Sequence, residues 1–157
     1  MANQLWLLRH GEAEPHDARP DGDRRLTGRG VEQSAAAGRA LARLSLPVHA
    51  VFTSPKVRAR DTALAACAAL ELEPIEHAAL AEGFDAGDAM ELVAAAEPDQ
   101  RVLVVGHNPD FEQVIYDLTG ASIELRKGAL AGIRIKGTAR GELIALLQPR
   151  EIAALAG

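Results

Sequence analysis

The chain has 157 residues, of which 48% are hydrophobic and 25% are charged, a balance that is typical of a globular protein with a core of its own. Its net charge of −5 argues against binding to nucleic acid or to an anionic membrane. The apolar runs are far shorter than the roughly 18 residues that cross a bilayer. The single cysteine, Cys67, excludes an internal disulfide and a cysteine metal site. We therefore expect one domain over residues 1–157, without a targeting segment, in the cytoplasm.

Short apolar runs alternate along the chain with longer segments of helical periodicity. We expect strands at residues 4–8, 49–55, 74–76 and 101–109, and a hairpin over 129–148 that turns at 136–141. We expect helices at residues 28–44, 55–70, 88–96, 109–119 and 149–155.

Capping residues predict where three of these helices begin. Thr27 precedes the first helix, Ser54 precedes Pro55, and Asn108 precedes Pro109. The apolar residues of the first helix lie near helical spacing, which predicts that they face the core: Val31, Ala35, Leu41 and Leu44.

The alternation of strands and helices predicts an α/β fold with a mainly parallel sheet and helices on both faces. The terminal hairpin requires at least one antiparallel strand, so the sheet is expected to be mixed. Sheets of this kind bind ligands at the carboxyl ends of their strands, where helix N-termini also point. We therefore look for function at that edge.

Three separate segments bring two arginines and two histidines to this edge. Arg9 and His10 end the first strand, Arg58 lies in the first turn of the second helix, and His107 ends the "VLVVGH" strand. Taken singly, a histidine at a strand end is more often a hydrogen-bonded structural residue, and an arginine at a helix start is usually solvated. The convergence of all four favours a functional site.

These residue types suit phosphoryl chemistry. Two guanidiniums present planar donors that match phosphate oxygens, and a neutral imidazole is a competent nucleophile toward phosphorus. A second histidine can hold another phosphoryl oxygen, and Gly11 is expected to let a phosphate approach the backbone. A metal site is the rival interpretation of two histidines. We reject it because the arginines repel cations and no carboxylate spacing supports it.

Four stretches of the sequence, "LLRHGEAE", "RRLTGRG", "TSPKVRARDTA" and "VVGHNP", resemble in order the landmarks of the histidine phosphatase superfamily, which also contains the cofactor-dependent phosphoglycerate mutases. The resemblance implies that His10 is the phosphorylated nucleophile and that Arg9, Arg58 and His107 bind phosphate. It also implies a three-layer α/β/α sandwich with a mixed, mainly parallel six-stranded sheet. No cofactor is expected.

The short length, "LAEGFDAGD" and "LQPREIAAL" look most like the small SixA-type phosphohistidine phosphatases. This resemblance implies dephosphorylation of phosphohistidine in a partner protein. The alternatives are a general phosphatase of small phosphoesters, a phosphoglycerate mutase, and an idle module that binds phosphate or a phosphoprotein. The chain lacks the long insertion that encloses a mutase pocket, and idle relatives usually lose the histidine that stands here as His10.

The general acid is left open by the sequence. Many members of the superfamily use a carboxylate from the middle of the chain, and Glu82 in "ALAEGF" is either that acid or simply a solvated side chain. Glu12 and Glu14 are weaker candidates. The loop "EPHDARPDGDRR" contains side chains that we expect either to contact the substrate or to stay solvated: His16, Arg19, Arg24 and Arg25.

Overall fold

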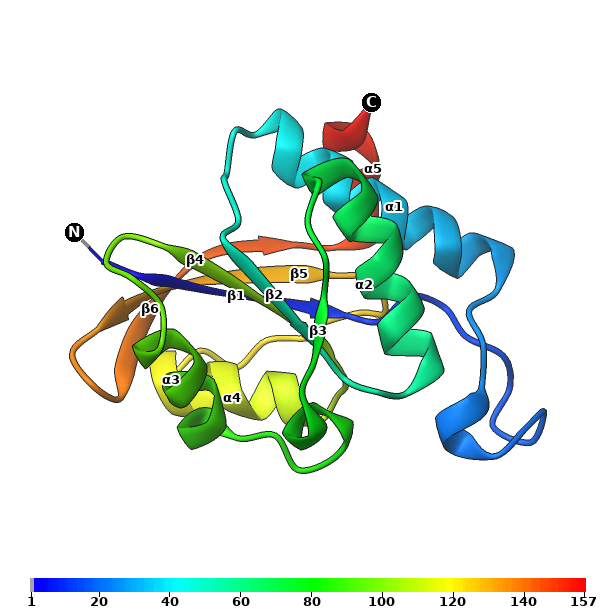
Figure 1. Ribbon diagram of the computed structural model, residues 1–157, viewed down its shortest axis with the longest axis horizontal. Coiled ribbons are helices and arrows are strands. Elements are labelled where there is room, and N and C mark those ends of the chain that lie inside the picture. The colour runs from blue at the N-terminus through cyan, green and yellow to red at the C-terminus, as the bar shows by residue number, and fades with distance from the viewer. Residues whose placement is uncertain (1) are drawn as a thin grey trace.

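The sheet of the protein has six strands in the order β3-β2-β4-β1-β5-β6, as seen in a computed structural model that describes residues 2–157 (Figure 1). The strands are β1 (Gln4–Arg9), β2 (Ala50–Thr53), β3 (Ile75–Glu76), β4 (Arg101–Gly106), β5 (Leu130–Lys136) and β6 (Arg140–Leu147). Neighbouring strands pair in parallel except at β5, which is antiparallel to both β1 and β6. The predicted mixed, mainly parallel sheet is therefore confirmed.

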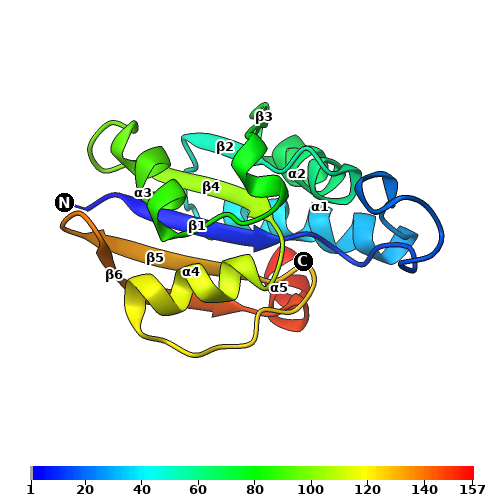
Figure 2. The ribbon, with the colours of Figure 1, turned by 90° about the horizontal axis from the view of Figure 1, so that it is seen from below.

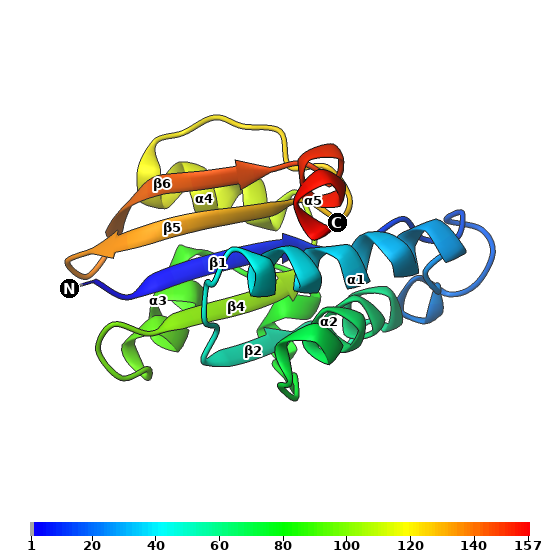
Figure 3. The ribbon, with the colours of Figure 1, turned by 90° about the horizontal axis from the view of Figure 1, so that it is seen from above.

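Helices cover both faces of this sheet and complete three layers. The helices are α1 (Gly28–Arg43), α2 (Val57–Leu70), α3 (Ala86–Ala94), α4 (Asp110–Thr119) and α5 (Pro149–Ala156), with short 3₁₀ turns η1 (Asp21–Asp23) and η2 (Ala78–Ala81). Helices α3 and α4 lie on one face (Figure 2), and α1, α2 and α5 lie on the other (Figure 3). Across residues 2–157, no helix combines the length and the apolar character needed to cross a membrane.

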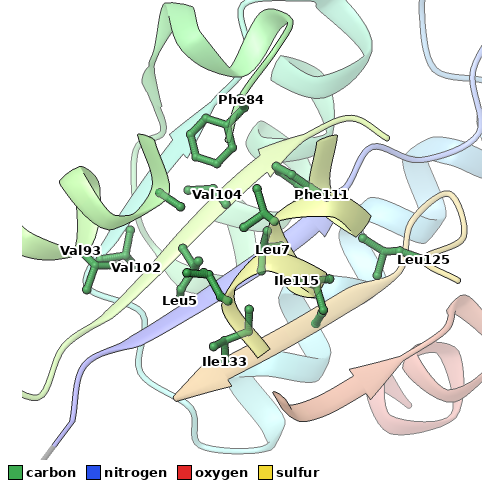
Figure 4. Close-up of a cluster of buried hydrophobic side chains, with 14 of the residues drawn as sticks. Leu5, Leu7, Phe84, Val93, Val102, Val104, Phe111, Ile115, Leu125 and Ile133 are labelled. Atoms are coloured by element: carbon green, nitrogen blue, oxygen red, sulfur yellow. The ribbon is translucent and has the colours of Figure 1, made fainter. Parts of the chain in front are cut away.

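Strand β1 is buried on both faces, which explains its unbroken apolar run. Leu5 and Leu7 pack with Phe111 in the cluster beneath α3 and α4 (Figure 4). Trp6 and Leu8 point to the opposite cluster, against α1 and α2. Each such side chain contributes about 1.5–3 kcal/mol when fully buried. This packing holds the residues that follow β1 at a fixed place on the sheet edge.

The buried face of α1 is built from small residues and differs from the predicted one. Val31 and Leu44 are 49% and 40% exposed, so their predicted core positions are wrong, while Leu41 is fully buried and Ala35 is half-buried. The reason is the close packing of α1 on α2, where a Cβ on Gly38 would collide with the backbone of α2. An alanine and glycine surface permits this approach, and Val31 and Leu44 point away from it.

Two helix starts near the sheet edge can be compared with the capping predictions. Thr27 is confirmed as the N-cap of α1, because its hydroxyl accepts a hydrogen bond from the N–H of Gly30 at 3.1 Å. Helix α2 begins at Val57 rather than at Pro55. Ser54 is therefore not its N-cap, although its hydroxyl accepts a hydrogen bond from the N–H of Lys56 at 3.2 Å. The same hydroxyl also takes part in the site described below.

Two other helix starts differ by one or two residues. Helix α3 begins at Ala86 because Asp85 caps it, accepting a hydrogen bond from the N–H of Asp88 at 2.9 Å. Helix α4 begins after Pro109, which occupies the N-cap position instead of the first turn.

Candidate active site

Three chain segments are joined side by side at the carboxyl edge of the sheet. The N–H of His10 donates to the carbonyl of Gly106 at 3.0 Å, and the N–H of Ser54 donates to that of Val105 at 3.0 Å. His107 directly follows Gly106. The ends of β1, β2 and β4 are thus fixed to one another by backbone hydrogen bonds, as the predicted topology requires.

The four side chains predicted from the sequence line one cavity of about 130 Å³. This volume is well below the roughly 300–1,000 Å³ of pockets for drug-sized ligands, and it suits a group of phosphate size. The residues that line the cavity are Arg9, His10, His16, Arg24, Arg58, His107, Asn108 and Lys127. The structure therefore brings the four predicted residues together with two of the candidate loop residues, His16 and Arg24, and adds Asn108 and Lys127.

The imidazole of His10 is oriented by the next residue in the chain. Its Nδ1 lies 2.7 Å from the carbonyl oxygen of Gly11, and a carbonyl only accepts, so Nδ1 carries the hydrogen and Nε2 keeps its lone pair. Burial lowers the pKa of His10 to about 3, and the charges of His107, Arg58 and Arg9 act in the same direction. His10 is therefore neutral at pH 7, with Nε2 able to act as a nucleophile.

His107 lies beside His10, with their ring centroids 5.2 Å apart. Its Nε2 is 2.8 Å from the hydroxyl oxygen of Ser54, while its buried Nδ1 has no hydrogen-bond partner. Burial lowers the pKa of His107 to about 3, with Arg58 and Lys56 adding to the effect. When the Ser54 hydroxyl donates to Nε2, the ring hydrogen sits on Nδ1, which can then donate to an anion.

Arg9 is held by the segment that follows α4. Its Nη1 donates to the carbonyl of Leu125 at 2.9 Å, and the side-chain amide of Asn108 donates to the same oxygen at 2.9 Å. The N–H of Leu125 in turn donates to the carboxylate of Glu112 at 2.8 Å. Strand β1, helix α4 and this segment thus together determine where the guanidinium of Arg9 lies.

Arg58, from α2, and Arg24, from the loop between β1 and α1, are both almost fully buried, at 5% and 6% exposure. Arg58 donates through Nη1 to the backbone carbonyl of Asp21 at 2.6 Å and through Nη2 to its carboxylate at 3.3 Å. The same carboxylate accepts from Arg24 at 3.1 Å and from Lys56 at 2.9 Å. Sequence reasoning missed Asp21 because no periodicity or capping motif distinguishes it from the other loop acids.

Buried donors without partners are concentrated at this cavity. Among the described residues, the fully buried side-chain nitrogens and oxygens that lack a hydrogen bond are Arg9 Nε, Arg24 Nε, Arg58 Nε and His107 Nδ1. All four belong to residues that line the cavity. Leaving such groups unsatisfied is costly, and an anion with several acceptor oxygens would satisfy them. The donor set fits phosphate.

The other loop residues named from the sequence separate into two groups. His16 lines the cavity together with Arg24, whereas Arg19 and Arg25 do not. Arg19 pairs with Glu14 at 2.9 Å on the loop surface, and the backbone N–H of Arg25 donates to the same carboxylate at 2.8 Å. These contacts stabilise the loop itself.

Within the described chain, none of the residues that line the cavity is a carboxylate. Glu82 is exposed at the end of η2 and lies outside the lining. The carboxylate of Glu12 accepts a hydrogen bond from the hydroxyl of Thr27 at 2.7 Å, and Glu14 is engaged as described above. The structure therefore does not bring the candidate acids to the cavity.

Gly11 is required for packing, so its predicted role of admitting a phosphate is wrong. It does not line the cavity. A Cβ at this position would lie 2.6 Å from the carbonyl oxygen of Gly30 in the first turn of α1. The absence of a side chain lets the chain after β1 contact the start of that helix.

Comparison with known proteins identifies the family. A model of the histidine phosphatase superfamily (branch 1) matches residues 5–88, more than half of the chain. The chain belongs to the histidine phosphatase superfamily. A relative at 33% identity is an uncharacterized protein of Picosynechococcus sp. (strain ATCC 27264 / PCC 7002 / PR-6), with 94% of this chain and 97% of that protein covered.

Solved structures of SixA histidine phosphatases share the fold. The protein histidine phosphatase SixA, complexed with tungstate, superposes with a TM-score of 0.85 at 23% identity, covering 95% of this chain and 99% of that one. The putative phosphohistidine phosphatase SixA of Nakamurella multipartitia has a TM-score of 0.79 at 28% identity, covering 95% and 97%. The predicted SixA-like architecture is thereby confirmed.

Proposed function

We propose that the protein is a phosphatase that transfers the phosphoryl group of its substrate to His10. The observation that carries this proposal is the set of four unpartnered buried donors, all on residues that line the same cavity as His10. These donors supply the charge and hydrogen bonds that a phosphoryl group demands, and the neutral Nε2 of His10 supplies the electron pair.

The reaction proceeds in two displacements. Phosphoryl oxygens bind Arg9, Arg24, Arg58 and His107, and Nε2 of His10 attacks phosphorus as the bond to the leaving group breaks. Water then attacks the phosphohistidine, the P–N bond breaks, and inorganic phosphate and neutral His10 are released with a proton passing to solvent. The fixed donors stabilise the equatorial oxygens in both steps.

Phosphohistidine in a partner protein is the substrate class that we propose. An alkoxide leaving group needs a positioned acid, and the described lining contains no carboxylate to serve as one. Phosphohistidine can be protonated on its ring and leave as neutral imidazole, whose conjugate acid has a pKa of about 6.5. The similarity to SixA proteins supports the same choice. The cytoplasmic location remains a prediction.

One comparison of substrates distinguishes the proposed function from two alternatives, a general phosphomonoesterase and an idle phosphate-binding module. The wild-type protein is assayed with a phosphohistidine peptide, an alkyl phosphate and nitrophenyl phosphate, and we expect the alkyl phosphate to be the slowest. Equal rates for alkyl phosphate and phosphohistidine would favour a general phosphomonoesterase. The absence of turnover with every substrate, with phosphate binding retained, would favour an idle phosphate-binding module.

The nucleophile is tested by trapping the intermediate. Radioactive phosphate from the substrate should appear on His10 in a form that is acid-labile and base-stable. Label on His107 would contradict the assignment.

The substitution Glu82→Gln tests whether Glu82 is the general acid. We expect it to leave the rates of alkyl phosphate and phosphohistidine hydrolysis unchanged, because Glu82 is exposed outside the cavity lining. A selective loss of alkyl phosphate hydrolysis would restore Glu82 as the acid.

A further inference from the structure

One exposed carboxylate binds three cationic side chains at the wall of the cavity. Asp21 lies in η1, on the loop between β1 and α1, and its two oxygens accept hydrogen bonds from Arg24, Lys56 and Arg58 at 3.1, 2.9 and 3.3 Å. We call these four residues the Asp21 cluster. Lys56 and Arg58 belong to the start of α2, so the cluster joins the loop to that helix.

The contacts use particular nitrogens of each guanidinium. Arg58 donates hydrogen bonds to Asp21 through both Nη1 and Nη2. Arg24 donates through Nη1 to the carbonyl of Glu14 and through Nη2 to the carboxylate of Asp21. In both residues Nε remains buried and unpartnered. Because a guanidinium is planar and rigid, fixing its terminal nitrogens also fixes the direction of its Nε–H. The contacts with Asp21 thus set the direction of two of the donors assigned to phosphate.

The charges of the cluster explain why a carboxylate is needed there. Burial lowers the pKa of Arg58, the charge of Asp21 opposes this effect, and the charge of Arg24 adds to it. The two arginines therefore repel each other across a small cavity, and Asp21 offsets the repulsion. Hydrogen bonds from Lys56 and Arg24, with the charge of Arg58, hold the pKa of Asp21 well below its usual value. The Asp21 carboxylate is therefore ionised at pH 7.

We propose that Asp21 is a positioning residue that holds Arg24 and Arg58 in the arrangement that binds the phosphoryl group, and that keeps the loop over the cavity. The proposal rests on the phosphatase function proposed above. Asp21 acts through the two arginines and does not itself contact substrate. The opposing view is that Asp21 only neutralises excess charge. Under that view, removal of the Asp21 carboxylate would tighten phosphate binding, because a nearby negative charge would be lost, whereas positioning predicts weaker binding.

The test compares Asp21→Ala and Asp21→Asn with Asp23→Asn, a matched control in the same 3₁₀ turn whose side chain takes no part in the cluster. Binding of inorganic phosphate is measured by calorimetry, kcat and KM are measured with nitrophenyl phosphate, and the melting temperature reports folding. Asp21→Ala should weaken phosphate binding about tenfold and lower kcat/KM about 10- to 100-fold, the range expected for charge-assisted hydrogen bonds. Asp21→Asn should fall between Asp21→Ala and the wild type because it keeps one acceptor oxygen, and Asp23→Asn should match the wild type.

A double-mutant cycle separates positioning from a general effect on stability. If Asp21 acts through Arg24, Asp21→Ala should cost much less phosphate affinity in an Arg24→Ala background than in the wild type. Equal or tighter phosphate binding in Asp21→Ala, or an equal loss in Asp23→Asn, would overturn the proposal. Phosphate binding is read without turnover. A wild type that binds phosphate but hydrolyses no substrate would therefore overturn the phosphatase function and still leave Asp21 fully tested.

Discussion

The cavity has two halves that are held in different ways. Arg9, His10 and His107 extend from the sheet, and their backbone is fixed by the hydrogen bonds that continue the strand ladders. His16 and Arg24 lie on the loop between β1 and α1, which extends beyond the carboxyl end of β1 (Figure 1). Backbone hydrogen bonds join the two arms of this loop, and side-chain contacts of Asp21 join its tip to the start of α2. Backbone hydrogen bonds of the sheet therefore hold the half that bears the nucleophile, whereas the position of the half that completes the anion site depends on ion pairs.

The largest effect is expected in the sheet half. His10→Ala should lower kcat by at least about 1,000-fold, because no other group can take over the covalent step. The variant should fold normally, because His10 lies at the sheet edge outside both hydrophobic clusters. Turnover with nitrophenyl phosphate and a thermal melt check both points. Substantial remaining activity would show that the sheet half does not supply the nucleophile.

Arg58 belongs to α2 but contacts the loop, so it tests where the two halves join. Arg58→Lys should lower kcat/KM about 100-fold, because an ammonium cannot give directed contacts to both Asp21 and phosphate. Arg60→Lys, at a half-buried position on the same helix outside the cavity lining, is the matched control. Vanadate should inhibit the wild type competitively and Arg58→Lys much more weakly. Unchanged kinetics in Arg58→Lys would remove this side chain from the phosphate site.

The loop half should affect binding more than chemistry. Arg24→Ala removes one donor assigned to phosphate and leaves His10 in place, so we expect about a tenfold loss in kcat/KM, mostly through KM. The neighbouring Arg25→Ala is the control, because Arg25 does not line the cavity. Steady-state kinetics on both variants provide the comparison. If both substitutions had the same effect, Arg24 would have no specific part in the site.

A last difference concerns the pH dependence of stability rather than activity. Burial lowers the pKa values of His10 and His107 to about 3 from an ordinary value of about 6.5. The unfolded chain therefore binds two protons below pH 6.5 that the folded chain refuses until about pH 3, and the free energy of unfolding falls as the pH drops across this window. His10→Ala should show a shallower fall. Urea titrations at pH 7 and pH 4.5 measure the difference, and an equally steep fall in the variant would contradict it.

The same two halves differ in how far the sequence predicts them. The continuous apolar run before Arg9 and the strand before His107 indicate parallel, doubly buried strands, and parallel strands must bring their carboxyl ends together. The four principal residues could therefore be found from topology. The loop has no such periodicity: the sequence names His16 and Arg24 only as possible contacts and gives no signal for Asp21, whose role depends on tertiary contacts.

Other differences have the same origin in tertiary packing. The exposure of Val31 and Leu44 follows from the close approach of α1 and α2, where alanines form the interface. Ser54 precedes a proline and suggests a helix cap, yet its hydroxyl contacts His107 at the end of the neighbouring strand β4. Glu82 follows a family pattern in the sequence, but the exposed end of η2 leaves it outside the lining. Local signals cannot reveal which partner a side chain meets.

The contact between Gly11 and Gly30 has a consequence for the mutational tolerance of the protein. Any side chain at Gly30 would collide with the backbone of Glu12, and one at Gly11 would collide with Gly30. The carbonyl of Gly11 is also the group that orients His10. Two glycines that lie outside the cavity lining therefore restrict sequence change around the nucleophile. The positions that tolerate substitution are fewer than the residues lining the cavity alone would indicate.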